Sequence, residues 1–450
     1  MRALRARLVS TIVLGVAACS AACRSLGGIP TEQQVGDRIK ERTGQSVRAS
    51  GEPSLPPNAS LDDGLTQEEA VAIALWNNAG FQRALVDLGI ARADVAAAGL
   101  LRNPVLTLLL PWGPKQLEAT AKLPIDAIWQ RPRRLAAARA GATAVAERLV
   151  AGALTLVADT RLAFVDLAIA NRRVALAGEQ LQLGQRMADL ARRRFEAGDI
   201  SQLDADIVAT EAARTQQDAE RAALDVDMAR NRLHEILGLG DAAPPTALKP
   251  SDQSPIPGQH AACGEDTRSM ERDAWSARPE LRAAELEIEA AARRLGWEKS
   301  RVFSLLAVLD ANSRGTEGFE LGPGVETDFG LFDRNQPGVM RASAELDRSK
   351  ARYVEVREQI RHELGDAYAR LVRSRAAESA WRDDIRPRLE RQAAQTQRAY
   401  EEGELSYLNV LDSLRRLNEG RTRELDAAAD VRRALVAVEK SLGRPCVNQS

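Results

Sequence analysis

The chain is 450 residues long, and its 62 Lys and Arg residues nearly balance its 63 Asp and Glu residues. This balance argues against nucleic-acid binding, because proteins that bind nucleic acid carry a basic patch or stripe. The three scattered histidines His234, His260 and His362 cannot form a metal site with ordinary ligand spacing. Aromatic residues make up only 4% of the chain, and the prevalence of alanine, leucine, arginine and glutamate is typical of long packed helices.

The first residues have the pattern of an export signal. Arg2, Arg5 and Arg7 precede an apolar stretch from Leu8 to Ala18, which is too short to span a membrane as a helix. Small residues followed at once by Cys19 resemble a bacterial lipobox, which predicts a signal peptide over residues 1–18 and a covalent lipid on Cys19. This lipid, including palmitate, is the one non-protein group that we expect. Ordinary signal cleavage near this point is the alternative.

The first repeat begins after a Gly-, Pro- and Ser-containing segment, and we expect residues 19–64 to form the lipid anchor and an extended tether. Thr66 and Glu69 have the spacing of a capping box, which predicts a helix that ends before Pro104. A short apolar run from Val105 and a strictly alternating run from Gln116 to Leu123 then predict a β-hairpin.

A very long helix is predicted after Pro132, because apolar residues recur every seventh position as far as Phe195. Gly198 is expected to end this helix in a left-handed conformation, and Ser201 is expected to cap a return helix that runs to about Leu237. Five prolines then mark an irregular segment that contains Cys263.

The same plan returns in the second half. A helix is predicted from about Ser269 to Lys299, then two strands over 302–312 and 319–331, then a long helix from Pro337 to Tyr400, and a return helix from Leu405 to Leu442. Gly198 and Gly403 lie 205 residues apart, within the similar phrases FEAGDISQLD and YEEGELSYLN. The chain is thus expected to be mainly α-helical and duplicated, each half a helix, a β-hairpin, a long helix, a turn and a helix. The predicted parts are the signal peptide 1–18, the anchor and tether 19–64, the first repeat 65–238 (strands about 104–127), an equatorial segment 239–267, the second repeat 268–443 (strands about 302–332) and the tail 444–450.

The predicted strands have one apolar and one polar face, as membrane barrels require. Four strands cannot close a barrel, since the smallest known barrels have about eight. Edges left open cannot face hydrocarbon, so the chain must oligomerise if its strands are in a membrane. A trimer would supply twelve strands and would also give each long helix two neighbours. A soluble β-subdomain is the alternative.

These features resemble the TolC-like outer-membrane efflux protein family, in its lipoprotein branch. The resemblance covers about residues 62–443 and rests on Cys19, the duplicated plan, both glycine-centred turns and the string Leu331-Phe332-Asp333-Arg334-Asn335-Gln336, which is similar to one in ducts of metal- and drug-exporting systems. It implies a homotrimer with a twelve-stranded β-barrel in the Gram-negative outer membrane, among its lipids, continuous with a periplasmic α-helical barrel. It also implies a periplasmic adaptor and an inner-membrane pump as partners. For Asp333, Arg334 and Asn335, turn chemistry is favoured over the alternative that they line the join between the two barrels.

The resemblance implies that both turns form the periplasmic tip where the adaptor docks, and the residues assigned to this contact are Gly198, Ser201, Leu203, Gly403, Ser406 and Leu408. Leu203 and Leu408 are expected to pack within the protein first. Acidic residues near the turns either solvate and cap helix ends or form rings at the mouth that favour cations; the candidates are Asp199, Asp204 and Glu404. Cys263 and Cys446 either form a disulfide, which an oxidising compartment allows, or stay unpaired.

The predicted function is a passive exit duct in a tripartite efflux system. The chain carries no P-loop sequence, and no nucleophile–base pair or phosphate-binding loop indicates an enzyme. A periplasmic adaptor or structural lipoprotein is the alternative, although adaptors normally have one helical hairpin among lipoyl-like β-domains. The transported substrate does not follow from the sequence.

Overall fold

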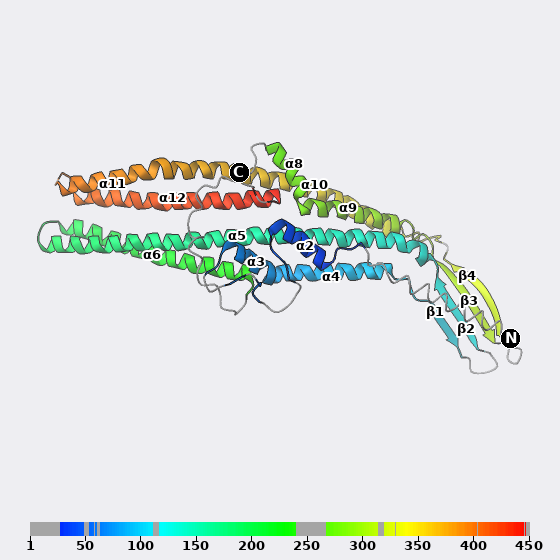
Figure 1. The fold of residues 1–450 in the computed structure, drawn as a ribbon. Helices are drawn as coiled ribbons and strands as arrows, with labels where there is room; N and C mark the ends of the chain where they lie inside the picture. Colours follow the sequence, from blue (N-terminus) through cyan, green and yellow to red (C-terminus); the bar gives the residue numbers. More distant parts are fainter. Residues whose placement is uncertain are drawn as a thin grey trace. The chain divides into compact units, whose positions relative to one another are not determined.

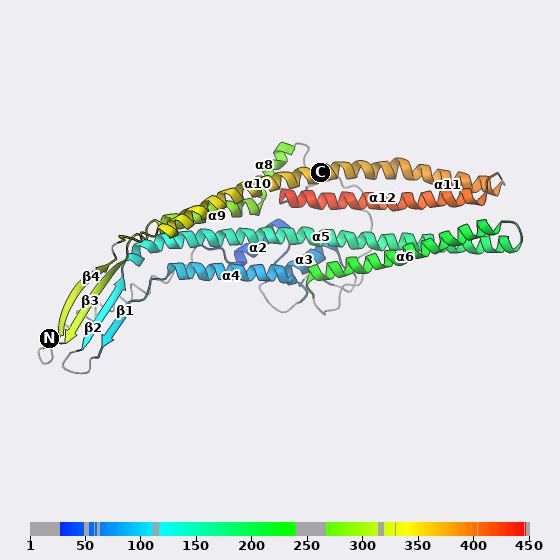
Figure 2. The same ribbon diagram turned by 180° about the vertical axis from the view of Figure 1, so that it is seen from behind.

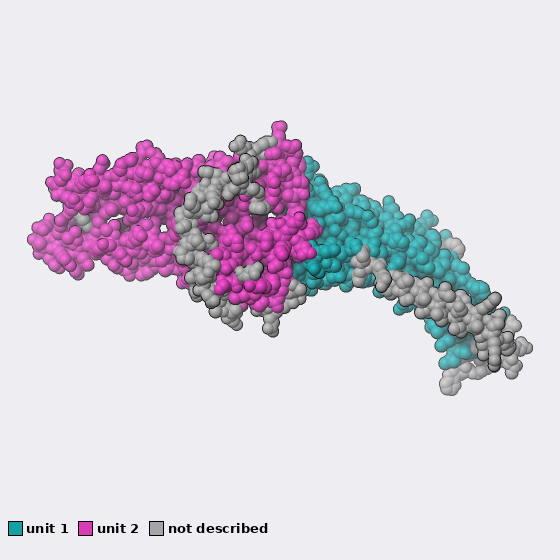
Figure 3. All heavy atoms as spheres, viewed as in Figure 1, with its two compact units in different colours: residues 1–35, 84–150, 279–358 teal, residues 36–83, 151–278, 359–450 magenta. Residues whose placement is uncertain are grey.

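A computed structural model describes residues 28–48, 54–57, 59–60, 64–110, 117–239, 267–313, 319–328, 330–402, 404–444 and 446. The chain divides into two compact units, which Figure 3 colours separately. Unit 1 consists of residues 1–35, 84–150 and 279–358, and unit 2 consists of residues 36–83, 151–278 and 359–450. Each unit therefore takes segments from both halves of the duplicated sequence.

Unit 1 contains one four-stranded antiparallel sheet with the order β1-β2-β3-β4 (Figure 1). The strands are β1 (Val105–Leu109), β2 (Glu118–Pro124), β3 (Leu305–Ser313) and β4 (Phe319–Thr327). The two predicted hairpins are confirmed and pair with each other through β2 and β3. β3 starts three residues later than predicted, and β4 ends four residues earlier.

The register gives the sheet one polar and one apolar face. Thr120 donates a hydrogen bond to Asp310 directly across from it, at 2.7 Å, and Lys122 forms an ion pair with Glu326 at 2.5 Å on the same face. Alternation places the apolar side chains opposite, because successive residues in a strand point to opposite faces. Those on the apolar face are largely exposed, including Leu106, Leu108, Leu309, Leu321 and Val325.

The helices of unit 1 are α4 (Ala79–Gly99), the first part of α5 (Asp126–Glu196), α9 (Pro279–Glu298) and the first part of α10 (Gln336–Ser379). Two arginines of α5 cap the carboxyl end of α4: Arg131 donates to the carbonyl of Gly99, and Arg134 donates to those of Ala98 and Leu100. Cations at this end satisfy the last carbonyls and complement the helix dipole. Burial lowers the pKa of Arg134, and the nearby charges of Arg102 and Arg131 lower it further.

The turn that leads from β4 into α10 is held by side-chain hydrogen bonds. Asn335 has a left-handed backbone with φ of 62°, and its amide side chain donates to the buried Glu298 at 2.7 Å. The carboxylate of Asp333 accepts from the backbone N–H of Asn335 at 2.7 Å, and Arg334 donates to the carbonyl of Gly330. These contacts support turn chemistry for Asp333, Arg334 and Asn335.

Unit 2 contains two helical hairpins, which lie side by side in both Figure 1 and Figure 2. The first joins α5 to α6 (Gln202–Leu237), and the second joins α11 (Arg386–Glu401) to α12 (Tyr407–Leu442). The predicted helix from Pro337 to Tyr400 is continuous but contains the π-helical turn η2 (Ala380–Ile385), where the Arg386 N–H bonds to the Trp381 carbonyl. Pro387 explains the wider turn, because proline lacks an N–H and its ring clashes with the carbonyl four residues before it.

In each repeat, the single helix predicted before the β-hairpin is in fact two helices. The first divides into α3 (Gln67–Asn77) and α4 at Asn78, and the second divides into α8 (Thr267–Ala277) and α9 at Arg278. Asn78 caps α4 by accepting a hydrogen bond from Phe81, and it also donates to the Ile236 carbonyl of α6 at 3.0 Å. The continuous-helix predictions are therefore wrong at these two points, where the breaks accommodate the ends of the return helices.

The predicted extended tether also contains a helix, α2 (Glu32–Thr43). Thr31 and Gln34 exchange capping hydrogen bonds at its start, and Val35 and Ile39 are fully buried one turn apart. This part of the tether prediction is wrong, because a capping pair followed by an apolar i, i+4 pair is enough to dock a short helix.

A hydrophobic cluster from α3, α5 and α6 forms a core of unit 2 and includes Ile73, Phe164, Leu167, Leu233 and Leu237. Beside it, four ion pairs join α5 to α12: Asp159 with Lys440, Arg161 with Glu439, Asp166 with Arg433, and Arg173 with Asp426. All four share one antiparallel register. Each pair is partly exposed and so contributes about 1 kcal/mol or less, but together the pairs fix how the two hairpins align.

In each helical hairpin, one glycine allows the two helices to approach closely. On the first, a Cβ added to Gly184 of α5 would lie 2.7 Å from the Thr215 hydroxyl of α6. On the second, a Cβ added to Gly420 of α12 would lie 2.5 Å from Leu389 of α11. Gly184 corresponds to Leu389, and Thr215 to Gly420, in the 205-residue repeat. The two helices of each hairpin therefore approach closely at equivalent positions. The glycine that allows this lies on the first helix, α5, in one hairpin and on the second helix, α12, in the other.

Candidate functional site: the hairpin turns and the groove between the hairpins

The turn of the first hairpin forms as the sequence predicts. Gly198 has a left-handed φ of 81°, which a residue with a Cβ rarely adopts. Its N–H bonds to the Phe195 carbonyl at 2.9 Å, and the Asp199 N–H bonds to the Arg194 carbonyl at 2.8 Å. Ser201 then caps α6 by accepting from the Asp204 N–H at 3.1 Å.

The second turn is similar in its described part. Ser406 is the N-cap of α12 but makes no side-chain bond to the helix backbone; instead its hydroxyl accepts from the Asn409 amide at 3.0 Å. The Glu404 N–H bonds to the Ala399 carbonyl at 2.8 Å. Gly403 lies outside the described residues.

One side-chain contact links the two turns. Arg194, on the last turn of α5, donates a hydrogen bond to the Tyr400 hydroxyl of α11. Its guanidinium also lies 5.4 Å from the centroid of the Tyr400 ring, a cation–π geometry.

Apolar residues at the turns are exposed. Leu203 is 69% exposed and Leu408 is 38% exposed, so the expectation that they pack within the protein is wrong for Leu203 in particular. Phe195, Ile207 and Leu405 are also exposed. A group of exposed large apolar side chains at one end of a helical hairpin is typical of a protein contact site.

The acidic candidates differ in their surroundings. Asp204 accepts a hydrogen bond from the Ser201 hydroxyl at 2.8 Å as well as serving the cap through its backbone, so capping accounts for it. Asp199 and Glu404 engage in the turns through their backbones. Helix capping therefore accounts for the carboxylate of Asp204 but not for those of Asp199 and Glu404.

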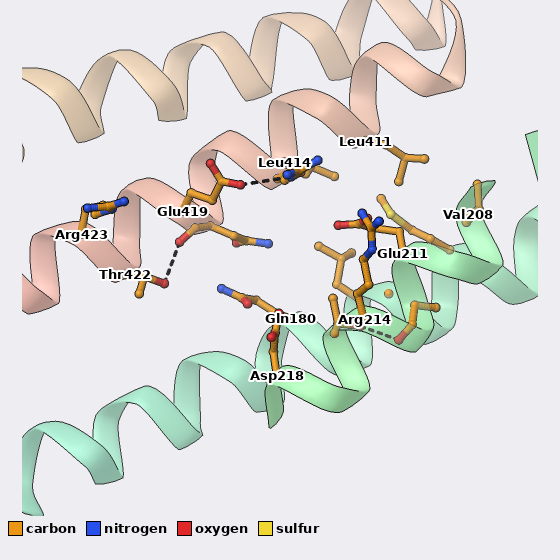
Figure 4. A pocket seen from close by; sticks show the side chains of 17 residues that line it. Gln180, Val208, Glu211, Arg214, Asp218, Leu411, Leu414, Glu419, Thr422 and Arg423 are labelled. Atoms are coloured by element: carbon orange, nitrogen blue, oxygen red, sulfur yellow. Dashed lines mark hydrogen bonds and ion pairs between the residues drawn. The ribbon is translucent and has the colours of Figure 1, made fainter. Parts of the chain in front are cut away.

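A groove opens where the ion pairs between α5 and α12 end. It has a volume of about 370 Å³ and is lined by α5 around Gly184, by α6 around Thr215 and by α12 from Leu411 to Arg423 (Figure 4). Its apolar lining includes Leu183, Met187 and Leu414, while Glu211, Arg214, Arg415 and Glu419 are paired within their own helices at its rim. The hydrogen bond to Glu419 raises the pKa of Arg415. Sequence reasoning missed this groove, because it depends on how two hairpins align.

Cys446 is disulfide-bonded. Its expected partner Cys263 lies outside the described residues, as does the predicted lipidation site Cys19. Within the described ranges, no group of three or more His, Cys, Asp or Glu side chains could hold a metal ion. Among the same residues, no helix is long and apolar enough to cross a membrane.

The comparison with known proteins decides the family. A family model described as "Outer membrane efflux protein" matches residues 71–239 and 272–444, which are most of the chain. The chain belongs to the outer membrane efflux protein family. The matched ranges coincide with the two repeats and leave out the segment between them.

Relatives of this efflux protein support the same fold. It is 26% identical over 386 residues to the cobalt-zinc-cadmium resistance protein CzcC of Cupriavidus metallidurans, covering 84% of this chain and 90% of CzcC. A crystal structure of a membrane protein from Pseudomonas aeruginosa matches with a TM-score of 0.73 at 21% identity, covering 89% and 97% of the two chains. Crystal structures of CusC, described in terms of folding and transmembrane channel formation, match with a TM-score of 0.70 at 19% identity, covering 89% and 99%.

Proposed function

We propose that this efflux protein forms a homotrimeric exit duct of a tripartite efflux system, through which substrates leave passively across the outer membrane. One observation carries the proposal: a sheet with an exposed apolar face whose edge strands β1 and β4 each pair with one neighbour only among the described residues. Such edges must be paired if the sheet lies in lipid. Pairing β4 of one copy with β1 of the next closes a barrel of twelve strands in a trimer.

The periplasmic adaptor is the competing function. It is less well supported, because two helical hairpins and a single sheet with an apolar outer face match the repeat plan of a duct.

In a duct, the polar face of the sheet would line the pore. It carries Glu118, Asp310, Glu320 and Glu326 against one lysine, Lys122, and so favours cations.

Conductance in planar bilayers separates the two functions. We expect the purified full chain to run as a trimer in detergent and to insert as a stable, voltage-independent channel. A stable trimer that forms no channels would contradict the duct.

The same recordings test the charges at the turns. We expect the double variant Asp199→Ala and Glu404→Ala to lower the preference for cations over anions, measured as the reversal potential in a salt gradient, because three copies would remove six carboxylates from one opening. Asp225→Ala, at an exposed position further along α6, is the control. An unchanged reversal potential in the double variant would exclude these two residues from selectivity.

Adaptor docking is proposed at the hairpin turns and the adjoining groove. The support is the exposure of Leu203 and Leu408 beside a groove that both apolar and charged side chains line. An α-helical hairpin of a partner fits such a groove, since an amphipathic helix places its apolar side chains between two helices.

Site-specific photocrosslinking in the native cell tests the docking. We expect a photoreactive phenylalanine at Leu203 to capture a periplasmic adaptor, identified by mass spectrometry. Leu224, which is 58% exposed on the same helix, is the matched control. Capture at Leu203 of other copies of the chain alone would place an oligomer contact there instead.

Metal cations are the cargo class that the comparisons favour. CzcC is described as a cobalt, zinc and cadmium resistance protein. The acidic polar face of the sheet supports a cationic cargo on electrostatic grounds.

A further inference from the structure

Two exposed aromatic residues contact each other at the end of the sheet where the strands connect to the helices. The rings of Trp129 on the first turn of α5 and Phe303 just before β3 lie 6.3 Å apart at 45°, and they are 40% and 51% exposed. Phe303 is two residues before Leu305, which lies on the apolar face, so extending the alternation of β3 by two residues predicts the same side for Phe303. The pair therefore continues the apolar face at its α-helical end.

An arginine follows on the same side of α5. Exposed positions recur along the first turns of this helix at Ile128, Trp129, Pro132 and Arg133, so Trp129 and Arg133 are neighbours one turn apart. Arg131 and Arg134 point elsewhere and cap α4. No carboxylate of the described residues lies within ion-pair distance of Arg133.

Charge changes sign across this boundary. The junction band, defined as residues 99–104, 125–134, 298–304 and 328–336, has seven basic and four acidic residues. The strands beside it, residues 105–110, 117–124, 305–313 and 319–327, have one basic and four acidic residues. An apolar face, then aromatic rings, then uncompensated positive charge is the order of groups met on leaving a bilayer with anionic headgroups.

We propose that the Trp129–Phe303 pair lies at the periplasmic boundary of the hydrocarbon and that Arg133 binds the phosphate of an anionic phospholipid there. This inference rests on the proposed membrane barrel. The indole and phenyl rings occupy the interfacial layer, and the arginine stem lies along apolar surface while its guanidinium reaches the headgroup. Guanidinium suits this ligand because it binds phosphate oxygens with two parallel hydrogen bonds.

The position of Trp129 is tested in vesicles of phosphatidylcholine and phosphatidylglycerol that contain the full chain. The difference in fluorescence between the wild type and Trp129→Phe isolates this indole. We expect brominated lipids to quench it more strongly when the bromines lie near the carbonyl end of the acyl chains than when they lie near the methyl end. Absence of quenching overturns the inference. If channels still conduct in that case, the proposed duct stands and the inference alone fails.

The role of Arg133 is tested by native mass spectrometry of the detergent-solubilised chain with added phosphatidylglycerol. We expect Arg133→Glu to weaken phosphatidylglycerol binding about tenfold, a loss of one charge-assisted contact. Arg133→Lys should keep part of the binding, and Arg221→Glu, at an exposed position on α6, should keep all of it. Equal lipid binding in Arg133→Glu overturns the phosphate assignment. Dissociation of the oligomer in Arg133→Glu, with Trp129 unquenched, would show that this face joins two copies.

Discussion

Alanine at Gly238 is expected to destabilise the protein by about 3 kcal/mol, whereas alanine at Gly443 should cost only about 1 kcal/mol. Both glycines end return helices in a left-handed conformation, with φ of 64° and 68°, and they occupy equivalent positions in the two repeats. The backbone strain of a Cβ is therefore the same at both. Space differs: a Cβ at Gly238 would lie 2.6 Å from the Asn77 carbonyl oxygen, while the nearest atom to one at Gly443 is 3.5 Å away.

The thermal unfolding midpoint in detergent, followed by circular dichroism at one scan rate, measures this difference. A fixed scan rate is needed because large membrane oligomers unfold irreversibly. Equal shifts for the two variants would mean that the break between α3 and α4 moves to admit the methyl group. In that event the close contact with Asn77 would not limit the sequence at this position.

Replacing Arg278 with methionine should cost about 3 kcal/mol, because it leaves Glu363 without its main partner in a largely buried site. The Arg278 side chain is only 7% exposed and forms an ion pair with Glu363 at 3.0 Å. It also donates to the Ser441 carbonyl near the end of α12 at 3.4 Å. We take the lower end of the range for buried pairs, since Glu363 is 36% exposed and also accepts from Gln359.

Arg282→Met is the matched control for Arg278→Met. Arg282 forms an ion pair with Glu285 within α9 at 2.8 Å, and both side chains are well exposed, so its loss should be close to neutral. The thermal midpoint again gives the comparison. A large loss on Arg282→Met, or none on Arg278→Met, would show that burial does not set the contribution of these arginines.

Periodicity was enough to predict both hairpins of the sheet and the long helices of the two repeats. The helix breaks at Asn78 and Arg278 were missed, although Pro279 directly after Arg278 is a local signal that the preceding residue leaves the helical region. Helix α2 was missed because the Gly, Pro and Ser content of residues 19–64 was taken to indicate an extended tether throughout. Thr31, Gln34, Val35 and Ile39 did carry its capping and apolar signals.

The candidate site likewise has features that the sequence could predict and features that it could not. Gly198 and Ser201 could be placed from local chemistry, since a left-handed cap and an N-cap each depend on a few adjacent residues. The groove near Gly184, the Arg194–Tyr400 contact and the Trp129–Phe303 pair join residues far apart in the sequence. Nothing local indicates that Trp129 faces Phe303 rather than the interior, so those contacts required the structure.

The opposite placement of glycine at the two hairpins limits how the halves of this gene can recombine. A crossover between residue 184 and residue 215, or between their equivalents, would combine one helix from each repeat. It would set Gly184 against Gly420, leaving a void, or Leu389 against Thr215, producing a clash. The two repeats share one plan but are a matched pair of non-interchangeable parts, so exchanging their helices is expected to disrupt the packing of both hairpins.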